Sequence, residues 1–133
     1  MLGELNIKTS KRQELIDITR DVNDIIKKSN IKEGICNIFA MHATAAVVIN
    51  ENHDPNICLD LIEALSRLVP KGVWRHDKMD GNADSHIKSA ILGPGQNIPV
   101  KEGRLYLGRW QSVMLAELDA PRERTIAVTM VGD

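Results

Sequence analysis

The sequence predicts a single α+β domain with a mixed, largely antiparallel sheet, two main helices and one short helix. Hydrophobic residues make up 43% and charged residues 26% of the 133 residues, which is typical of a globular chain. Candidate strands occur in groups instead of alternating strictly with helices, which favours an α+β sheet with helices on one side over a doubly wound fold. No repeat, linker or low-complexity segment divides the chain, so we expect one domain over residues 1–133.

The N-terminal part predicts two strands and a helix. Residues 4–9 alternate apolar and polar side chains, as a half-buried strand does. Residues 14–18 are a short apolar segment, and the polar turn between the two segments predicts a hairpin. Thr19 is expected to cap a helix that ends near Asn30, because apolar residues then recur at helical spacing.

The middle of the chain predicts two more strands and the longest helix. Residues 35–41 are almost wholly apolar, as expected of a central strand covered on both faces, and residues 45–49 form the next strand. Asp54 followed by Pro55 predicts a helix start. A continuous apolar stripe then runs to Val69, before Pro70-Lys71-Gly72 stops the helix.

The C-terminal half predicts an ordered loop, a short helix and four strands. Residues 73–81 lack periodicity but are rich in His and Asp, and such loops often carry function. Residues 84–92 can form a short helix. The strands are expected at residues 98–100, 104–107, 111–118 and 124–131.

Charge and composition exclude several classes of protein. The net charge of −1, without runs of like charge, disfavours a nucleic-acid partner, and 3% aromatic residues cannot build a base-stacking surface. No segment approaches about 18 consecutive apolar residues, and no basic leader precedes an apolar stretch, so we expect a cytoplasmic protein without a membrane partner. Cys36 and Cys58 are expected to be reduced core residues.

The four histidines lie in or beside predicted turns, helix ends and loops. If the ends of the sheet fold together, His42, His76 and His86 could converge, and three imidazoles with a water form an open zinc site. Isolated surface or capping histidines are the alternative, and for His53 that alternative is the stronger one.

Carboxylates near these histidines could orient the imidazoles or exchange protons. They include Glu51, Asp77, Asp80 and Asp84. For Asp84, a proton-transfer role and capping of the short helix both remain open.

Lys88, Ser89 and the Gly93-Pro94-Gly95 turn could bind an anionic group, and Arg104 could add a positive charge. A tight turn and a solvated arginine are the alternatives. The chain has neither a Walker A pattern, nor a dinucleotide fingerprint, nor a nucleophile elbow.

Several ordered motifs resemble those of the YjbQ family, also called the secondary thiamine-phosphate synthase family. The motifs are His42-Ala43-Thr44-Ala45, Ile49-Asn50-Glu51-Asn52-His53-Asp54-Pro55, Asp80-Gly81-Asn82-Ala83-Asp84-Ser85-His86-Ile87-Lys88-Ser89, Gly103-Arg104-Leu105-Tyr106-Leu107-Gly108-Arg109-Trp110-Gln111 and Asp119-Ala120-Pro121-Arg122. The resemblance spans nearly the whole chain. Two departures affect ligand contacts: Ala43 replaces a hydroxyl residue, and Arg109 stands where the family often has a small or hydroxyl residue.

The resemblance implies a small YjbQ-like α+β fold, a homotrimer, and a divalent metal held by residues matching His42, His76 and His86. It also implies a weak thiamine-phosphate synthase activity, a transferase reaction that joins a pyrimidine diphosphate to a thiazole phosphate through a C–N bond. Histidine ligands favour zinc as the cofactor, whereas a diphosphate substrate favours magnesium.

These observations lead to two functional hypotheses. The first is a metal-binding enzyme acting on a small phosphorylated metabolite, with Glu51 or Asp84 as the catalytic proton-transfer group. The alternative is a homotrimer that binds a metal or ligand without turnover. The predicted substrate-binding residues are Asn82, Lys88, Ser89, Arg104 and Trp110.

Overall fold

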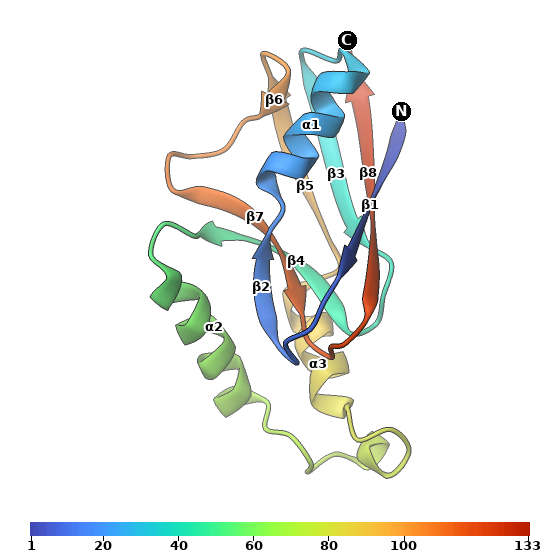
Figure 1. Ribbon diagram of the computed structural model, residues 1–133, viewed down its shortest axis with the longest axis vertical. Helices are drawn as coiled ribbons and strands as arrows, with labels where there is room; N and C mark the ends of the chain where they lie inside the picture. The colour runs from blue at the N-terminus through green and yellow to red at the C-terminus, as the bar shows by residue number, and fades with distance from the viewer.

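The strands form two antiparallel sheets in the computed structural model, which describes residues 1–133 (Figure 1). The five-stranded sheet has the order β1–β8–β3–β5–β6, with the bounds Leu2–Lys8, Glu123–Gly132, Gly34–Ala40, Gly95–Lys101 and Arg104–Leu105. The three-stranded sheet has the order β2–β7–β4, with the bounds Glu14–Asp17, Gln111–Glu117 and Ala45–Glu51. The predicted α+β class with a largely antiparallel sheet is confirmed, although the sheet is divided in two.

The helices occupy different positions relative to these sheets. Helix α1 contributes to the core between the sheets, whereas α2 and α3 lie against the other side of the three-stranded sheet (Figure 1). A single 3-10 turn, η1, lies in the loop that leads into α3. The bounds are Thr19–Ser29 for α1, Pro55–Leu68 for α2, Arg75–Lys78 for η1 and Ala83–Leu92 for α3.

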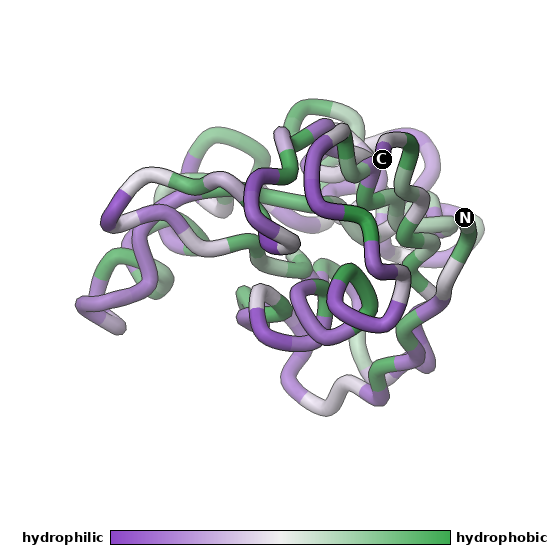
Figure 2. Tube along the Cα trace, turned by 90° about the horizontal axis from the view of Figure 1, so that it is seen from above, coloured by the Kyte–Doolittle hydropathy of each residue, from purple (hydrophilic) through white to green (hydrophobic).

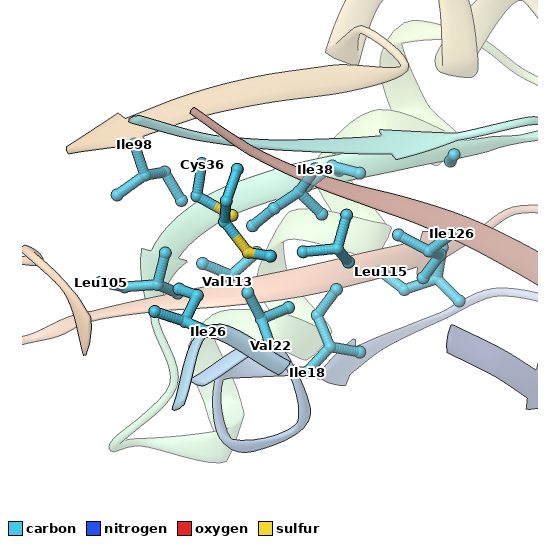
Figure 3. Close-up of a cluster of buried hydrophobic side chains, with 14 of the residues drawn as sticks. Ile18, Val22, Ile26, Cys36, Ile38, Ile98, Leu105, Val113, Leu115 and Ile126 are labelled. Carbon is cyan, nitrogen blue, oxygen red and sulfur yellow. The ribbon is translucent and has the colours of Figure 1, made fainter. Parts of the chain in front are cut away.

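The main hydrophobic core fills the space between the two sheets. Figure 3 shows side chains from α1 and from both sheets pointing toward one another. Strand β8 supplies Ile126, Val128 and Met130, which all point inward as the alternation of the sequence predicts. Cys36 is buried in this core as a free thiol, and burial raises its pKa to about 11.

The predicted hairpin between the first two strands is wrong. Strand β1 pairs with β8, whereas β2 pairs with β7 in the other sheet. The connection crosses between the sheets beside the β7–β8 connection, since the N–H of Thr9 donates to the carbonyl of Arg122 and that of Ala120 donates to the carbonyl of Arg12. The two segments that connect the sheets therefore run side by side, and no local hairpin forms between β1 and β2.

Strand β3 is central in its sheet, but only one of its faces is covered. Ile35 and Phe39 are 56% and 40% exposed on the outer face, where no helix packs. The prediction that β3 is covered on both faces is therefore wrong within one copy of the chain. A continuous apolar run cannot by itself show which face will be left open.

The helix starts agree partly with the sequence. Asp54 caps α2 as predicted, because its side chain accepts a hydrogen bond from the N–H of Asn56 at 3.0 Å. Ile18 occupies the N-cap position of α1 and makes no side-chain capping bond, so the predicted Thr19 cap is wrong. The hydroxyl of Thr19 instead accepts a hydrogen bond from the N–H of Val113 at 2.8 Å. Thr19 therefore anchors the helix to β7.

The two ends of the chain lie close together (Figures 1 and 2). The N-terminal ammonium of Met1 donates to the carbonyl of Met130 at 2.9 Å. Figure 2 also shows hydrophilic and hydrophobic stretches alternating along the trace, as expected when each strand has one buried face. None of the helices is long and apolar enough to cross a membrane.

Candidate functional site

The loop between α2 and α3 is fixed in place by Asp77. Its carboxylate accepts hydrogen bonds from the N–H of Trp74 and from the N–H of Ala83, both at 3.0 Å. These two backbone bonds lower the pKa of Asp77, so the carboxylate stays charged and holds η1 against the start of α3.

This arrangement brings His76 of η1 next to His86 of α3. The two ring centroids are 4.9 Å apart and the rings are almost perpendicular, at 81°. The Nε2 atom of His76 lies 3.6 Å from a carboxylate oxygen of Asp80. Two of the three histidines that the sequence predicts to converge therefore do so.

Both imidazoles line a pocket of about 670 Å³ beside α3, which we call the α3 pocket. More than half of its lining residues are hydrophobic, and Arg75 adds a positive charge. The lining residues are Val73, Trp74, Arg75, His76, Ala83, His86 and Ile87. A pocket with apolar walls and a few polar groups is typical of small-molecule sites.

His42 does not join this pair. It follows β3, and its Nε2 accepts a hydrogen bond from the N–H of Thr125 at 2.8 Å. Burial, together with the nearby positive charge of Arg124, lowers the pKa of His42 and favours the neutral ring. The Nε2 atom of His42 is therefore engaged with the backbone and does not face the other two imidazoles.

The three histidines therefore do not gather around one point within this chain. No group of three or more His, Cys, Asp or Glu side chains is placed so that it could hold a metal ion. The choice between zinc and magnesium as a cofactor stays a prediction.

Asp84 and Lys88 lie in an internal ionic cluster. Their side chains are only 1% and 2% exposed, and the Lys88 Nζ lies 3.3 Å from an Asp84 oxygen and 3.0 Å from the side-chain oxygen of Gln13. Arg12 donates to both oxygens of Asp84, at 3.2 and 3.3 Å. The cluster ties the β1–β2 connection to α3, so both predicted site residues form structural contacts in this chain. Their catalytic and substrate-binding roles stay predictions.

Three other predicted substrate-binding residues are dispersed. Asn82 donates to Asp119 at 2.8 Å, and Ser89 donates to the carbonyl of Ala45 at 2.7 Å. Arg104 lies on β6 and lines surface hollows beside α1, away from α3. Lys88 and Arg104 therefore do not face a common cavity.

Glu51 and Trp110, by contrast, share a second pocket with His53. This pocket has a volume of about 410 Å³ and lies where β4 ends and β7 begins. The ring centroids of His53 and Trp110 are 5.2 Å apart. No sequence pattern predicts that these rings meet, because 56 residues lie between them along the chain.

A second buried ion pair, Glu117–Arg124, is also absent from the sequence predictions. The Nε of Arg124 donates to Glu117 at 2.8 Å, and Arg124 also donates to the hydroxyl of Thr44. Burial alone raises the pKa of Glu117, but hydrogen bonds from Arg124 and Thr9 outweigh it and lower the pKa overall. One signal could have found this pair: Arg124 falls on the same face of β8 as the inward-pointing residues that follow it.

The fold and the α3 pocket define a small α+β protein with two antiparallel sheets and a pocket lined by two histidines. A model of the UPF0047 protein YjbQ-like family matches residues 3–133. The chain belongs to this family, as its motifs indicate.

Relatives in several organisms share the sequence along its full length. A UPF0047 protein of Methanocaldococcus jannaschii is 45% identical over 133 residues, which cover 100% of this chain and 96% of that protein. The UPF0047 protein YugU of Bacillus subtilis is 41% identical over 135 residues, covering 99% of this chain and 100% of YugU.

Solved structures agree with the fold. A YbjQ-like protein of unknown function from Sulfolobus solfataricus P2 superposes with a TM-score of 0.96 at 40% identity, covering 100% of this chain and 97% of that one. A hypothetical protein from Aeropyrum pernix K1 gives a TM-score of 0.95 at 35% identity, covering 100% and 99% of the two chains.

These comparisons overturn the function predicted from the sequence. The relatives are UPF0047 proteins without an assigned activity, and the Sulfolobus protein is described as one of unknown function. Together with the lack of a metal-holding group of side chains, they give no support to a metal-binding enzyme, to a metal-binding homotrimer or to thiamine-phosphate synthesis. The family resemblance was right, but the activity attached to it does not follow for this chain.

Proposed function

We propose that the α3 pocket binds a small organic acid with a flat, apolar body, and that His76 and His86 exchange a proton with it. The observation that carries this proposal is the placement of two imidazoles, 4.9 Å apart, in one largely apolar pocket. Imidazole is the side chain whose charge changes most readily near neutral pH, so a pair of them can give and accept a proton.

The rest of the pocket supports an acidic ligand. Val73, Trp74 and Ile87 offer apolar surface to a flat body, and Arg75 can pair with a carboxylate. The carboxylate of Asp80, 3.6 Å from the Nε2 atom of His76, places a negative charge next to that ring.

The reaction class is proton transfer next to a carbonyl, as in the interconversion of a keto acid and its enol. One imidazole takes the proton from the carbon, and the other, in its protonated form, donates a proton to the carbonyl oxygen. The C–H bond is lost and an O–H bond forms, so neither a metal nor a redox partner is needed.

Phenylpyruvate is a suitable probe because its benzylic C–H is acidic and its ring is flat. We expect the protein to accelerate deuterium incorporation from D2O at that carbon, as followed by proton NMR. His76→Ala and His86→Ala should each remove the acceleration, and Arg75→Gln should weaken binding. His53→Ala, outside the pocket, is the matched control.

Two results would contradict the proposal. One is an exchange rate no higher than that of the same concentration of free imidazole. The other is equal binding of benzoate and benzamide, since a site for acids must distinguish the carboxylate from the neutral amide.

We also propose that the chain forms the homotrimer expected from the family resemblance. Ile35, Phe39 and Val131 are exposed on the outer face of the five-stranded sheet, and α2 has no fully buried residue. Such apolar surface favours association with further copies. Light scattering at low micromolar concentration tests this, and a monomer mass would contradict it.

A further inference from the structure

The pocket between the ends of β4 and β7 is separate from the α3 pocket. Its lining residues are Asn50, Glu51, His53, Trp110 and Gln111, and it shares none of them with the α3 pocket. It lies at the first turn of α2, whereas the α3 pocket lies beyond the last turn of that helix. A helix of 14 residues is about 21 Å long. We call this second site the Trp110 pocket.

The rings in the Trp110 pocket form a wedge. The planes of His53 and Trp110 are tilted by 58°, so a flat ring cannot stack on both at once. Trp110 is 53% exposed, and the guanidinium of Arg109 lies 5.0 Å from its ring centroid. The indole therefore already attracts a cation of the chain itself, and it keeps open surface for another group.

The charge at this end of the sheet is negative. Glu51 makes no ion pair with any lysine or arginine of the chain. Asp17 is held in its charged form by hydrogen bonds, including one from Asn52 at 3.0 Å. Besides burial, these two carboxylates raise the pKa of the Cys58 thiol, which shows that their charges act on the same region.

We infer that the Trp110 pocket binds a compact organic cation, such as an alkylammonium or quaternary ammonium group. The wedge of rings suits a small rounded group, the indole attracts positive charge, and the carboxylate of Glu51 neutralises it. The amides of Asn50 and Gln111 add polar contacts at the rim. The cation can belong to a free small amine or to a lysine side chain, because both present the same chemistry.

The test compares choline with 3,3-dimethylbutan-1-ol, which has the same shape without the charge. Binding is followed by the indole N–H signal of Trp110 in proton–nitrogen NMR, assigned with the Trp110→Leu variant. We expect choline to shift this signal saturably and the neutral analogue to shift it at least tenfold more weakly, on the order expected for losing a cation–π contact and a charge.

Three variants sharpen the test. Glu51→Gln should weaken choline binding about tenfold, whereas Glu63→Gln on α2 removes a charge elsewhere and should leave it unchanged. Arg109→Gln should strengthen binding, because it removes a competing cation. Choline and Nα-acetyl-lysine amide, whose ε-ammonium group is free, are titrated in parallel. The ligand with the higher affinity shows whether the pocket prefers a free amine or a lysine side chain.

Several outcomes would overturn the inference. They are equal binding of choline and its neutral analogue, unchanged affinity in Glu51→Gln, weaker binding in Arg109→Gln, and no response of the Trp110 signal to any of the cations. Because none of these cations is an organic acid, failure here leaves the proposed function of the α3 pocket untouched.

Discussion

The chain contains two buried ionic pairs and two ring pairs at its surface, and the four pairs differ in what they can do. In the buried pairs, each charge is neutralised by its partner and is closed off from solvent. In the ring pairs, each ring has a partner on one side and a pocket on the other. The ionic pairs are Asp84–Lys88 and Glu117–Arg124, and the ring pairs are His76–His86 and His53–Trp110.

Helix α3 shows the difference most clearly, because it contributes to both kinds of pair. Asp84 and Lys88 are four residues apart and share the inner face of the helix. His86, midway between them, points to the other side and lines the pocket. Polar residues that are neighbours in sequence can therefore have unrelated tasks, and burial separates the structural ones from those that can meet a ligand.

The largest effect should come from breaking the Asp84 cluster. Asp84→Ala leaves Lys88 buried without its carboxylate and Arg12 without its partner, and we expect a loss of about 3–5 kcal/mol in the free energy of unfolding. Urea unfolding followed by circular dichroism measures it. The exposed Asp80→Ala variant is the control. A loss below about 1 kcal/mol would mean that the cluster is not structural.

The second buried pair should make stability depend on acid. Because the folded state lowers the pKa of Glu117, its contribution is present above the ordinary pKa of 4.5 and is lost as the pH falls through the lower folded value. Glu117→Gln should cost about 2 kcal/mol at pH 7 and much less at pH 3, so the two stability curves converge in acid. Parallel curves for the variant and the original chain would exclude this role.

A surface ring should matter much less for stability. His86→Ala removes a side chain that lines an open pocket, and we expect the free energy of unfolding to change by no more than about 1 kcal/mol. The same variant should lose the deuterium exchange of phenylpyruvate. A large loss of stability would move His86 into the structural group.

The smallest effect is expected at the exposed ion pair of α2. Glu63 and Arg67 are one helical turn apart and open to solvent. Glu63→Ala should therefore change the free energy of unfolding by about 0.5 kcal/mol or less, and added salt should reduce that difference further. An effect as large as that of Asp84→Ala would show that exposure does not separate the two classes of charge.

The sequence was informative where the signals are local. The Asp54–Pro55 start of α2 and the alternation along β8 needed only neighbouring residues, and both are confirmed. The hairpin expected between β1 and β2 is wrong, because a polar turn does not reveal that each strand has a distant partner.

The candidate site was harder to predict for the same reason. Lys88 is buried against Gln13, which is 75 residues away in the chain. The Nε2 atom of His42 accepts a hydrogen bond from Thr125, which is 83 residues away. No spacing rule connects such residues. His76 and His86, which are only ten positions apart around one loop, are the part of the predicted histidine cluster that the fold brings together.

The placement of β8 affects how the protein is made in the cell. This strand is synthesised after the other seven strands, yet it lies inside the five-stranded sheet, between β1 and β3. While the ribosome is still at work, β1 has no partner, and β3 has only β5 on one side. The unfinished chain therefore exposes two open strand edges, and insertion of β8 closes both at once. We expect this sheet to be completed only after β8 has left the ribosome, with chaperones acting on the open edges until then.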